Sequence, residues 1–309
     1  MTLIASTLAN ITVGEASTFQ NLTIFPLLKG GHHAAGYHTL DEALKLGGIR
    51  VTEVSEDGSV NELKVLNTLD LPVLLLDGQE LVGAKQNRVF NLTILVPANT
   101  ELLVPVSCVE AGRWRHSSAA FKTAGRAQYA AGRAERVSQV SDSLALRGLR
   151  ASDQSAVWRS IAAKESRMGV ESETGAMADM YERFEGTVDE YVQGLPAVEG
   201  QVGAIFLVSA EIIGLDLFDS ESTLHSLLAT LVRSHALDAL ESPRAEATPT
   251  ADAAVAFLKA VSTAPNASFK AVGLGDDVRL RDAAVSGAAL SADGELVHLC
   301  AYPAGEGRR

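Results

Sequence analysis

Apolar and polar residues alternate in short blocks over the first 116 residues, a pattern typical of β-strands separated by turns. One short helix is expected among them, because Thr39 and Glu42 form a capping box and a glycine pair follows. Asp-Gly pairs at 57–58 and 77–78 indicate hairpin-type turns. We therefore predict strands at residues 22–28, 49–54, 60–65, 71–76, 89–96 and 102–109.

The pattern becomes helical from residue 117 to about residue 192, where two or three helices are expected. A buried strand is predicted at 202–213, and the apolar spacing that begins at Leu224 predicts an amphipathic helix. Another helix is expected at 251–261. The chain then returns to strands, which we predict at 278–280, 285–290 and 295–302.

This order of elements favours an α+β fold over a doubly wound parallel sheet, because strands flank the helical block instead of alternating with helices. We expect a mostly antiparallel sheet built from N-terminal and C-terminal segments, with a helical middle. We predict a single domain over residues 1–309 that is β-rich at 1–116, helical at 117–200 and mixed at 201–309.

Composition limits the possible partners. The chain is 47% hydrophobic, enough for a large core, and its net charge of -12 disfavours nucleic acid and anionic membranes as partners. No apolar run approaches the roughly 20 residues that span a bilayer, and the N-terminus lacks the basic residues of a signal peptide, so a cytoplasmic location is expected. Cys108 and Cys300 fall on predicted strands and are expected to be reduced, small hydrophobic residues.

Residues 77–114 concentrate polar side chains within otherwise apolar strands. If residues 85–96 form one strand and 97–100 a hairpin loop, Val89 faces Cys108 and Asn87 faces Glu110, to within about one residue of register. The polar residues of this segment are Asp77, Gln79, Glu80, Lys85, Gln86, Asn87, Arg88, Asn91, Glu110, Arg113 and Trp114.

The end of this hairpin is the predicted functional site. Arginine and lysine neutralise phosphates, amides hydrogen-bond sugars and bases, and tryptophan stacks on bases, so a small phosphate-bearing or ribosyl ligand is expected. Glu110 is the candidate catalytic residue, as a general base or a ligand-orienting group. The alternative is structural: a buried Arg88–Glu110 pair that locks the sheet edge. The candidate ligand-binding residues are Lys85, Gln86, Asn87, Arg88, Asn91, Arg113 and Trp114.

Other features carry weaker predictions. Residues 111–150 contain eight basic residues against two acidic ones, which indicates either an anion site or a solvated helix face. Asp77 and Glu80 could bind a metal, although turn chemistry explains Asp77 alone. The histidines at 32, 33 and 38 lie in a glycine-rich loop without partner ligands, so a hydrolase that uses them is a third hypothesis. No motif indicates a cofactor.

Four strings resemble the ARPP domain, named for ADP-ribosylglycohydrolase and rhodanese-phosphatase-associated protein: residues 75–80 (LLDGQE), 83–88 (GAKQNR), 106–110 (VSCVE) and 112–114 (GRW). The resemblance extends from residues 22–27 to His298. It implies association with ADP-ribose-handling and phosphatase-like proteins, without a settled activity. We therefore carry two hypotheses. The first is a protein that binds or processes an ADP-ribose-like or nucleotide-like ligand, and the second is a non-catalytic assembly protein.

Overall fold

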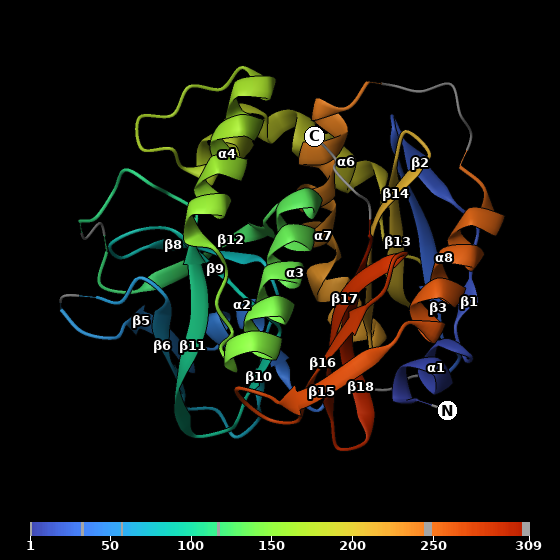
Figure 1. Cartoon of the computed structure of the whole chain (residues 1–309), viewed down its shortest axis with the longest axis horizontal. Helices are drawn as coiled ribbons and strands as arrows, with labels where there is room; N and C mark the ends of the chain where they lie inside the picture. The colour runs from blue at the N-terminus through green and yellow to red at the C-terminus, as the bar shows by residue number, and fades with distance from the viewer. Residues whose placement is uncertain (1, 32–33, 57, 116–117, 244–248, 305–309) are drawn as a thin grey trace. The chain divides into compact units, whose positions relative to one another are not determined.

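The structure is a computed structural model that describes residues 2–31, 34–56, 58–115, 118–243 and 249–304 (Figure 1). These residues form 8 helices and 18 strands, and the predicted α+β class is confirmed. The chain divides into two compact units. Unit 1 contains Met1–Ala35, Asp189–Ala271 and Gly275–Arg309, and unit 2 contains Gly36–Val188 and Val272–Leu274. The single domain stays a prediction.

Unit 1 is built on one nine-stranded antiparallel sheet, in which N-terminal and C-terminal strands lie side by side as predicted. The strand order is β1-β3-β13-β14-β18-β17-β16-β15, and β2 also pairs with β3. The strands are β1 (Thr12–Val13), β2 (Ser17–Phe19), β3 (Leu22–Leu28), β13 (Gln201–Val208), β14 (Glu211–Phe218), β15 (Asn266–Lys270), β16 (Asp276–Arg281), β17 (Val285–Ala292) and β18 (Glu295–Pro303).

The two faces of this sheet are covered by different helices. Ile205 and Leu207 of β13 join the core made with α1 (Leu3–Leu8) and α8 (Ala251–Thr263). Phe206 points to the other face, because side chains alternate along a strand, and its ring lies 3.8 Å from that of His235 in α7 (Glu221–Glu241). Figure 1 shows α7 and α8 on opposite sides of β13. Both predicted helices are confirmed.

The single strand predicted at 202–213 is wrong, because two strands occupy this region. β13 and β14 form a hairpin whose turn residues, Ser209 and Ala210, have φ values of 49° and 68°. Neither residue is typical of left-handed turns, so the sequence gives no turn signal there. The predicted turn at Asp293 and Gly294 is confirmed, with positive φ at both residues.

Unit 2 contains a six-stranded sheet, in the order β12-β8-β9-β11-β6-β5, and a three-stranded sheet, in the order β10-β7-β4. Its helices include α2 (Leu40–Lys45), whose predicted capping box is present, α3 (Ala130–Arg147), α4 (Gln154–Met168) and α5 (Met177–Arg183). The next helix, α6 (Glu185–Gly194), begins in unit 2. The strands are β4 (His38–Thr39), β5 (Ile49–Glu53), β6 (Glu62–Asn67), β7 (Val73–Leu75), β8 (Gln79–Gly83), β9 (Arg88–Phe90), β10 (Ile94–Val96), β11 (Thr100–Cys108) and β12 (Phe121–Ala127).

The predicted continuous strand at 85–96 is wrong. β9 pairs with β8 and β11, whereas β10 pairs with β7 in the other sheet, so the hairpin that matters is β8–β9. The chain bends at Asn91, whose amide donates to the Arg150 carbonyl at 3.1 Å and accepts from Ser107 Oγ at 2.5 Å. Arg88 lies opposite Cys108, one residue from the predicted register.

A strand also appears where only helices were predicted. β12 pairs antiparallel with β8 and shifts register between Thr123 and Ala127, around Gly125 with φ 64°. Glycine and small polar residues hide its period, so the segment resembles the helical region after it. Both cysteines are buried and free, as expected. No helix among the described residues is both long enough and apolar enough to traverse a membrane.

Candidate functional site

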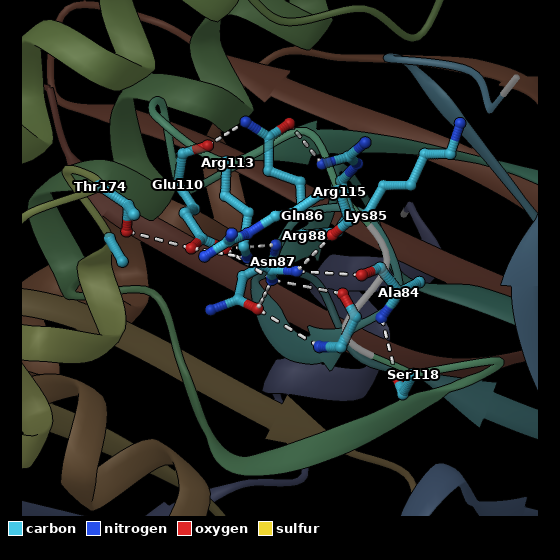
Figure 2. Close-up of polar contacts among 12 residues, drawn as sticks. Ala84, Lys85, Gln86, Asn87, Arg88, Glu110, Arg113, Arg115, Ser118 and Thr174 are labelled. Carbon is cyan, nitrogen blue, oxygen red and sulfur yellow. Dashed lines mark hydrogen bonds and ion pairs between the residues drawn. The ribbon is translucent and has the colours of Figure 1, made fainter.

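The candidate site surrounds the loop at residues 84–87, which joins β8 to β9 in unit 2 (Figure 2). Side chains from other elements accept hydrogen bonds from its backbone N–H groups, which fixes a loop that has no regular structure of its own. These bonds run from Ala84 to Ser118 Oγ, from Lys85 to Glu53 Oε1 and from Asn87 to Glu110 Oε2, at 2.9, 3.1 and 3.0 Å.

Glu110 and Arg113 hold one side of this loop. Arg113 Nε lies 2.8 Å from Glu110 Oε1, and Nη2 lies 2.7 Å from Oε2, a bidentate pair. Thr174 Oγ1 also donates to Glu110 Oε1, at 3.0 Å, and Arg113 Nη2 donates to Asn87 Oδ1 at 3.0 Å. We call Asn87, Glu110, Arg113 and Thr174 the Glu110 network. The structural alternative paired Glu110 with Arg88, whereas in the structure Glu110 pairs with Arg113.

The protonation of Glu110 follows from these contacts. Burial by itself raises the pKa of this carboxyl, but the hydrogen bonds from Arg113 and from the Asn87 backbone outweigh it and hold the pKa below its usual value. The carboxylate is therefore ionised, and its oxygens accept from protein donors. This arrangement favours a role in positioning the loop over general-base catalysis.

Arg88 behaves differently. Its side chain is fully buried, and Nη1 donates to Gln86 Oε1 at 2.7 Å. Nε and Nη2 have no hydrogen-bond partner in the part of the chain that the structure describes. Burial lowers the pKa of this guanidinium, and the nearby Glu53 carboxylate opposes that change. Arg88 thus presents two buried donors that the described protein leaves open.

Lys85, Glu53 and Trp114 lie around these open donors. The Lys85 ammonium and the Arg88 guanidinium lie 5.6 and 5.4 Å from the centroid of the Trp114 ring, within cation–π range. A side chain added at Gly58 would begin 3.2 Å from Lys85 Cδ, 3.3 Å from Glu53 Oε2 and 3.4 Å from Trp114 Cζ2, so the three converge there. We call Glu53, Lys85, Arg88, Cys108 and Trp114 the Arg88 site.

The predicted amide residues have structural partners. Gln86 bridges two parts of the cluster, because its Nε2 donates to the Glu110 carbonyl and its Oε1 accepts from Arg88. Asn87 Oδ1 accepts from the Gly83 N–H at 3.3 Å as well as from Arg113. Asn91 bonds to Ser107 and to the Arg150 carbonyl and lies apart from the Glu110 network.

Asp77 and Glu80, the weak metal candidates, are ion-paired with arginines. Asp77 accepts from Arg136 Nη2 at 2.9 Å and from Arg133 Nε at 3.3 Å, and Glu80 pairs with Arg126 at 2.6 Å. Burial raises the pKa of Glu80, while Arg126 opposes the shift. In the described ranges, no group of three or more histidine, cysteine, aspartate or glutamate side chains is placed to hold a metal.

The basic block at 111–150 is therefore neither an exposed anion site nor a solvated helix face at Arg133 and Arg136, which are fully buried. Both face the Asp77 turn, where Gly78 has φ 78° and a side chain would meet Arg133 Cγ and Arg136 Nη2 at 2.9 Å. The block instead supplies internal ion pairs. Of the three clustered histidines, those at 32 and 33 lie outside the described residues.

The sequence matches one known family over nearly its whole length. A family model described as ARPP-1, the ARG and Rhodanese-Phosphatase-superfamily-associated Protein domain, covers residues 10–302. The chain belongs to the ARPP-1 family. No curated protein and no solved structure gives a significant match.

Three of the four strings that carry the ARPP-1 resemblance meet in one place. Residues 83–88 contain the loop and the strand ends that flank it, residues 106–110 form the end of β11 and its continuation, and residues 112–114 bring Arg113 and Trp114 against the loop. The family model confirms the resemblance as family membership, and the structure shows which residues of these strings contact one another.

Three residues of this ARPP-1 cluster were not among the predicted site residues. Glu53 comes from the end of β5, Thr174 from the segment before α5, and Gln154 from the start of α4. Gln154 pairs with both backbone groups of Cys108, at 2.8 Å each. These three contacts span 32 to 64 residues of sequence, and no local pattern marks such distant partners.

Proposed function

We propose that this ARPP-1 protein binds a phosphate-bearing ligand, of the ADP-ribose or nucleotide type, at the Arg88 site. The observation that carries the proposal is the pair of buried donors on Arg88, Nε and Nη2, that no described group accepts. A guanidinium edge matches two phosphate oxygens in a bidentate pair. A bound phosphate would therefore accept the hydrogen bonds that the described residues leave open.

Energetics support this interpretation. A buried donor without a partner costs about 1–3 kcal/mol, and more when it is charged, against a total stability of about 5–15 kcal/mol for a typical protein. Buried polar groups in native proteins are paired in the great majority of cases. Two open donors on one buried side chain are therefore costly for a structural residue, and a ligand that accepts hydrogen bonds from them would offset that cost.

Charge supports an anionic ligand. The Arg88 site contains two cations, Lys85 and Arg88, and one carboxylate, Glu53. Cys108 adds no charge near neutral pH, because burial raises the pKa of its thiol to about 11. The site is therefore positive in a chain whose net charge is -12, and a phosphate group complements it.

Trp114 completes the proposed site. Its side chain is 46% exposed although it covers two buried cations, so it forms the outer wall of the Arg88 site. In this proposal the ring moves off the guanidinium when phosphate enters and then stacks on the base of the ligand. Arg113 and Glu110 shape the loop without contacting the ligand, so the proposal assigns no proton transfer to Glu110.

A second candidate function rests on the Glu110 network, whose groups are bonded within the protein. If the whole cluster is a structural lock of this kind, the chain is a non-catalytic assembly protein. The family description then points to partners among ADP-ribose-handling and phosphatase-superfamily proteins. A cytoplasmic location fits either function and remains part of the proposal.

A thermal-shift screen tests the proposal. ADP-ribose, NAD, common nucleotides and inorganic phosphate are added to the purified protein and to two variants, Arg88→Met and Arg115→Ala. Arg115 is exposed and serves as the matched control for removing an arginine charge. We expect a rise of several degrees in wild type and in Arg115→Ala that is absent in Arg88→Met. An equal rise in all three proteins, or none in wild type, would favour the assembly protein.

A further inference from the structure

The carboxylate of Glu53 adds a buried hydrogen-bond acceptor without a donor, among the described residues, to the Arg88 site. Its Oε1 accepts the Lys85 N–H at 3.1 Å, which fixes the side chain. Its Oε2 is buried and has no donor among the residues that the structure describes. An ionised carboxylate only accepts hydrogen bonds, so this oxygen calls for a donor.

The open groups on Glu53 and Arg88 do not satisfy each other. The carboxylate is close enough to oppose the burial effect on the pKa of Arg88, yet neither Oε2 nor the Nε and Nη2 atoms has a hydrogen-bond partner within the described ranges. Oε2 also faces Gly58, Lys85 and Trp114, as the contacts of a side chain added at Gly58 show. Open acceptor and open donors thus belong to one site.

We propose that the ligand of the Arg88 site is an oxyanion that also carries an O–H donor, and that Glu53 is the residue that selects for this donor. This inference rests on the proposed function and adds the chemical class of the ligand. The oxyanion accepts from Arg88 and Lys85, and the hydroxyl donates to Glu53 Oε2. An oxyanion without a hydroxyl leaves the Glu53 carboxylate buried next to a second negative charge, so it binds more weakly.

Two sources can supply the O–H group: the phosphate itself, when one of its oxygens is protonated, or a sugar hydroxyl beside a phosphate ester. Matched probes separate them. Inorganic phosphate and sulfate differ in the P–OH group, and glycerol 3-phosphate and propyl phosphate differ in the neighbouring hydroxyls. At about pH 8 all four are essentially dianions, so differences in their affinity do not reflect charge.

Isothermal titration calorimetry of the full chain with the four probes tests the inference. We expect wild type to bind the donor-bearing member of at least one pair about tenfold or more tightly. In Glu53→Gln, whose amide oxygen can still accept from Lys85, this preference should fall towards equality. Glu56→Gln removes an exposed carboxylate three residues away and should keep the preference.

The outcomes separate the inference from the proposed function. Binding that requires Arg88 but shows no preference within either pair overturns the role of Glu53 and leaves the phosphate site standing. An equal preference in wild type and in Glu53→Gln also overturns it. If none of the four probes binds, or if binding persists in Arg88→Met, the phosphate site itself fails and the inference fails with it.

Discussion

Two arginines at the same loop have opposite surroundings. Arg113 uses Nε, Nη1 and Nη2 in hydrogen bonds, and its acceptors include the Glu110 carboxylate and the Ala84 carbonyl. Arg88 is more deeply buried, and among the described residues it forms a hydrogen bond only through Nη1, to Gln86. The difference separates two roles that residue type cannot separate, because both are arginines within polar strings of the same family motif.

The two arginines are therefore distinguished by whether their hydrogen-bonding groups have partners within the described protein. The Glu110 network is closed, so it can fix the loop without any further molecule (Figure 2). The Arg88 site has buried donors and a buried acceptor without partners among the described residues, and in our proposal a bound ligand completes these hydrogen bonds. We therefore expect removal of a closed group to change stability and removal of an open group to change binding.

The largest expected effect on stability comes from Arg113→Ala, which disrupts the Glu110 network. It leaves the Glu110 carboxylate buried without its bidentate partner, and such a change costs about 3–5 kcal/mol. Urea unfolding followed by tryptophan fluorescence measures it, since both tryptophans, Trp114 and Trp158, lie in unit 2. Arg115→Ala, the exposed control, should change the free energy of unfolding by less than about 0.5 kcal/mol.

If Arg113→Ala lowers the free energy of unfolding by no more than Arg115→Ala does, the Glu110 network does not stabilise the fold. In that case, the hydrogen bonds of Arg113 would contribute nothing measurable, and satisfaction would not distinguish the two arginines.

Glu110→Gln tests the Glu110 network through the pH dependence of stability. The folded-state pKa of Glu110 lies below its ordinary value of 4.5, so ionisation stabilises the fold above that pH. This contribution is lost as the pH falls through the lowered pKa. Glu110→Gln should therefore cost about 1.5–3 kcal/mol near pH 7, from weakened bonds to Arg113, and progressively less below about pH 4.5.

The measurement is urea unfolding of both proteins at a series of pH values from 7 downwards. A difference in unfolding free energy that stays constant across the series would mean that the ionisation of Glu110 is not linked to folding, contrary to the role assigned to the Arg113 pair.

The sequence predicted elements well where local chemistry determines them. The capping box at Thr39, the strand at Leu22–Leu28 and the amphipathic helix from Leu224 are all present. It failed where distant contacts decide, as at Asn91, whose bonds to Ser107 and Arg150 end a strand that the apolar pattern continues. β12 was missed because its glycine and small polar residues hide the strand period and its partner β8 lies about 40 residues earlier.

The sequence predicted most of the residues that cluster at the candidate site, but not which of them bond to one another. Residues 85–88, Glu110, Arg113 and Trp114 do come together, because the polar strings flank one hairpin and the end of β11. Their roles could not be read from residue type. Glu53, which lies 32 residues before Lys85, joins them only through tertiary structure, so no local pattern indicated that it belongs to the site.

The smallest expected change in stability, and the most informative one, comes from Arg88→Met. A methionine of similar length removes the buried charge and the two open donors, while it also leaves Gln86 Oε1 without its donor. These effects oppose each other, so the free energy of unfolding should stay within about 1 kcal/mol of wild type even though ligand-induced thermal shifts disappear. If Arg88 were a structural lock like Arg113, the same substitution would cost about 3–5 kcal/mol, and the contrast between the two arginines would collapse.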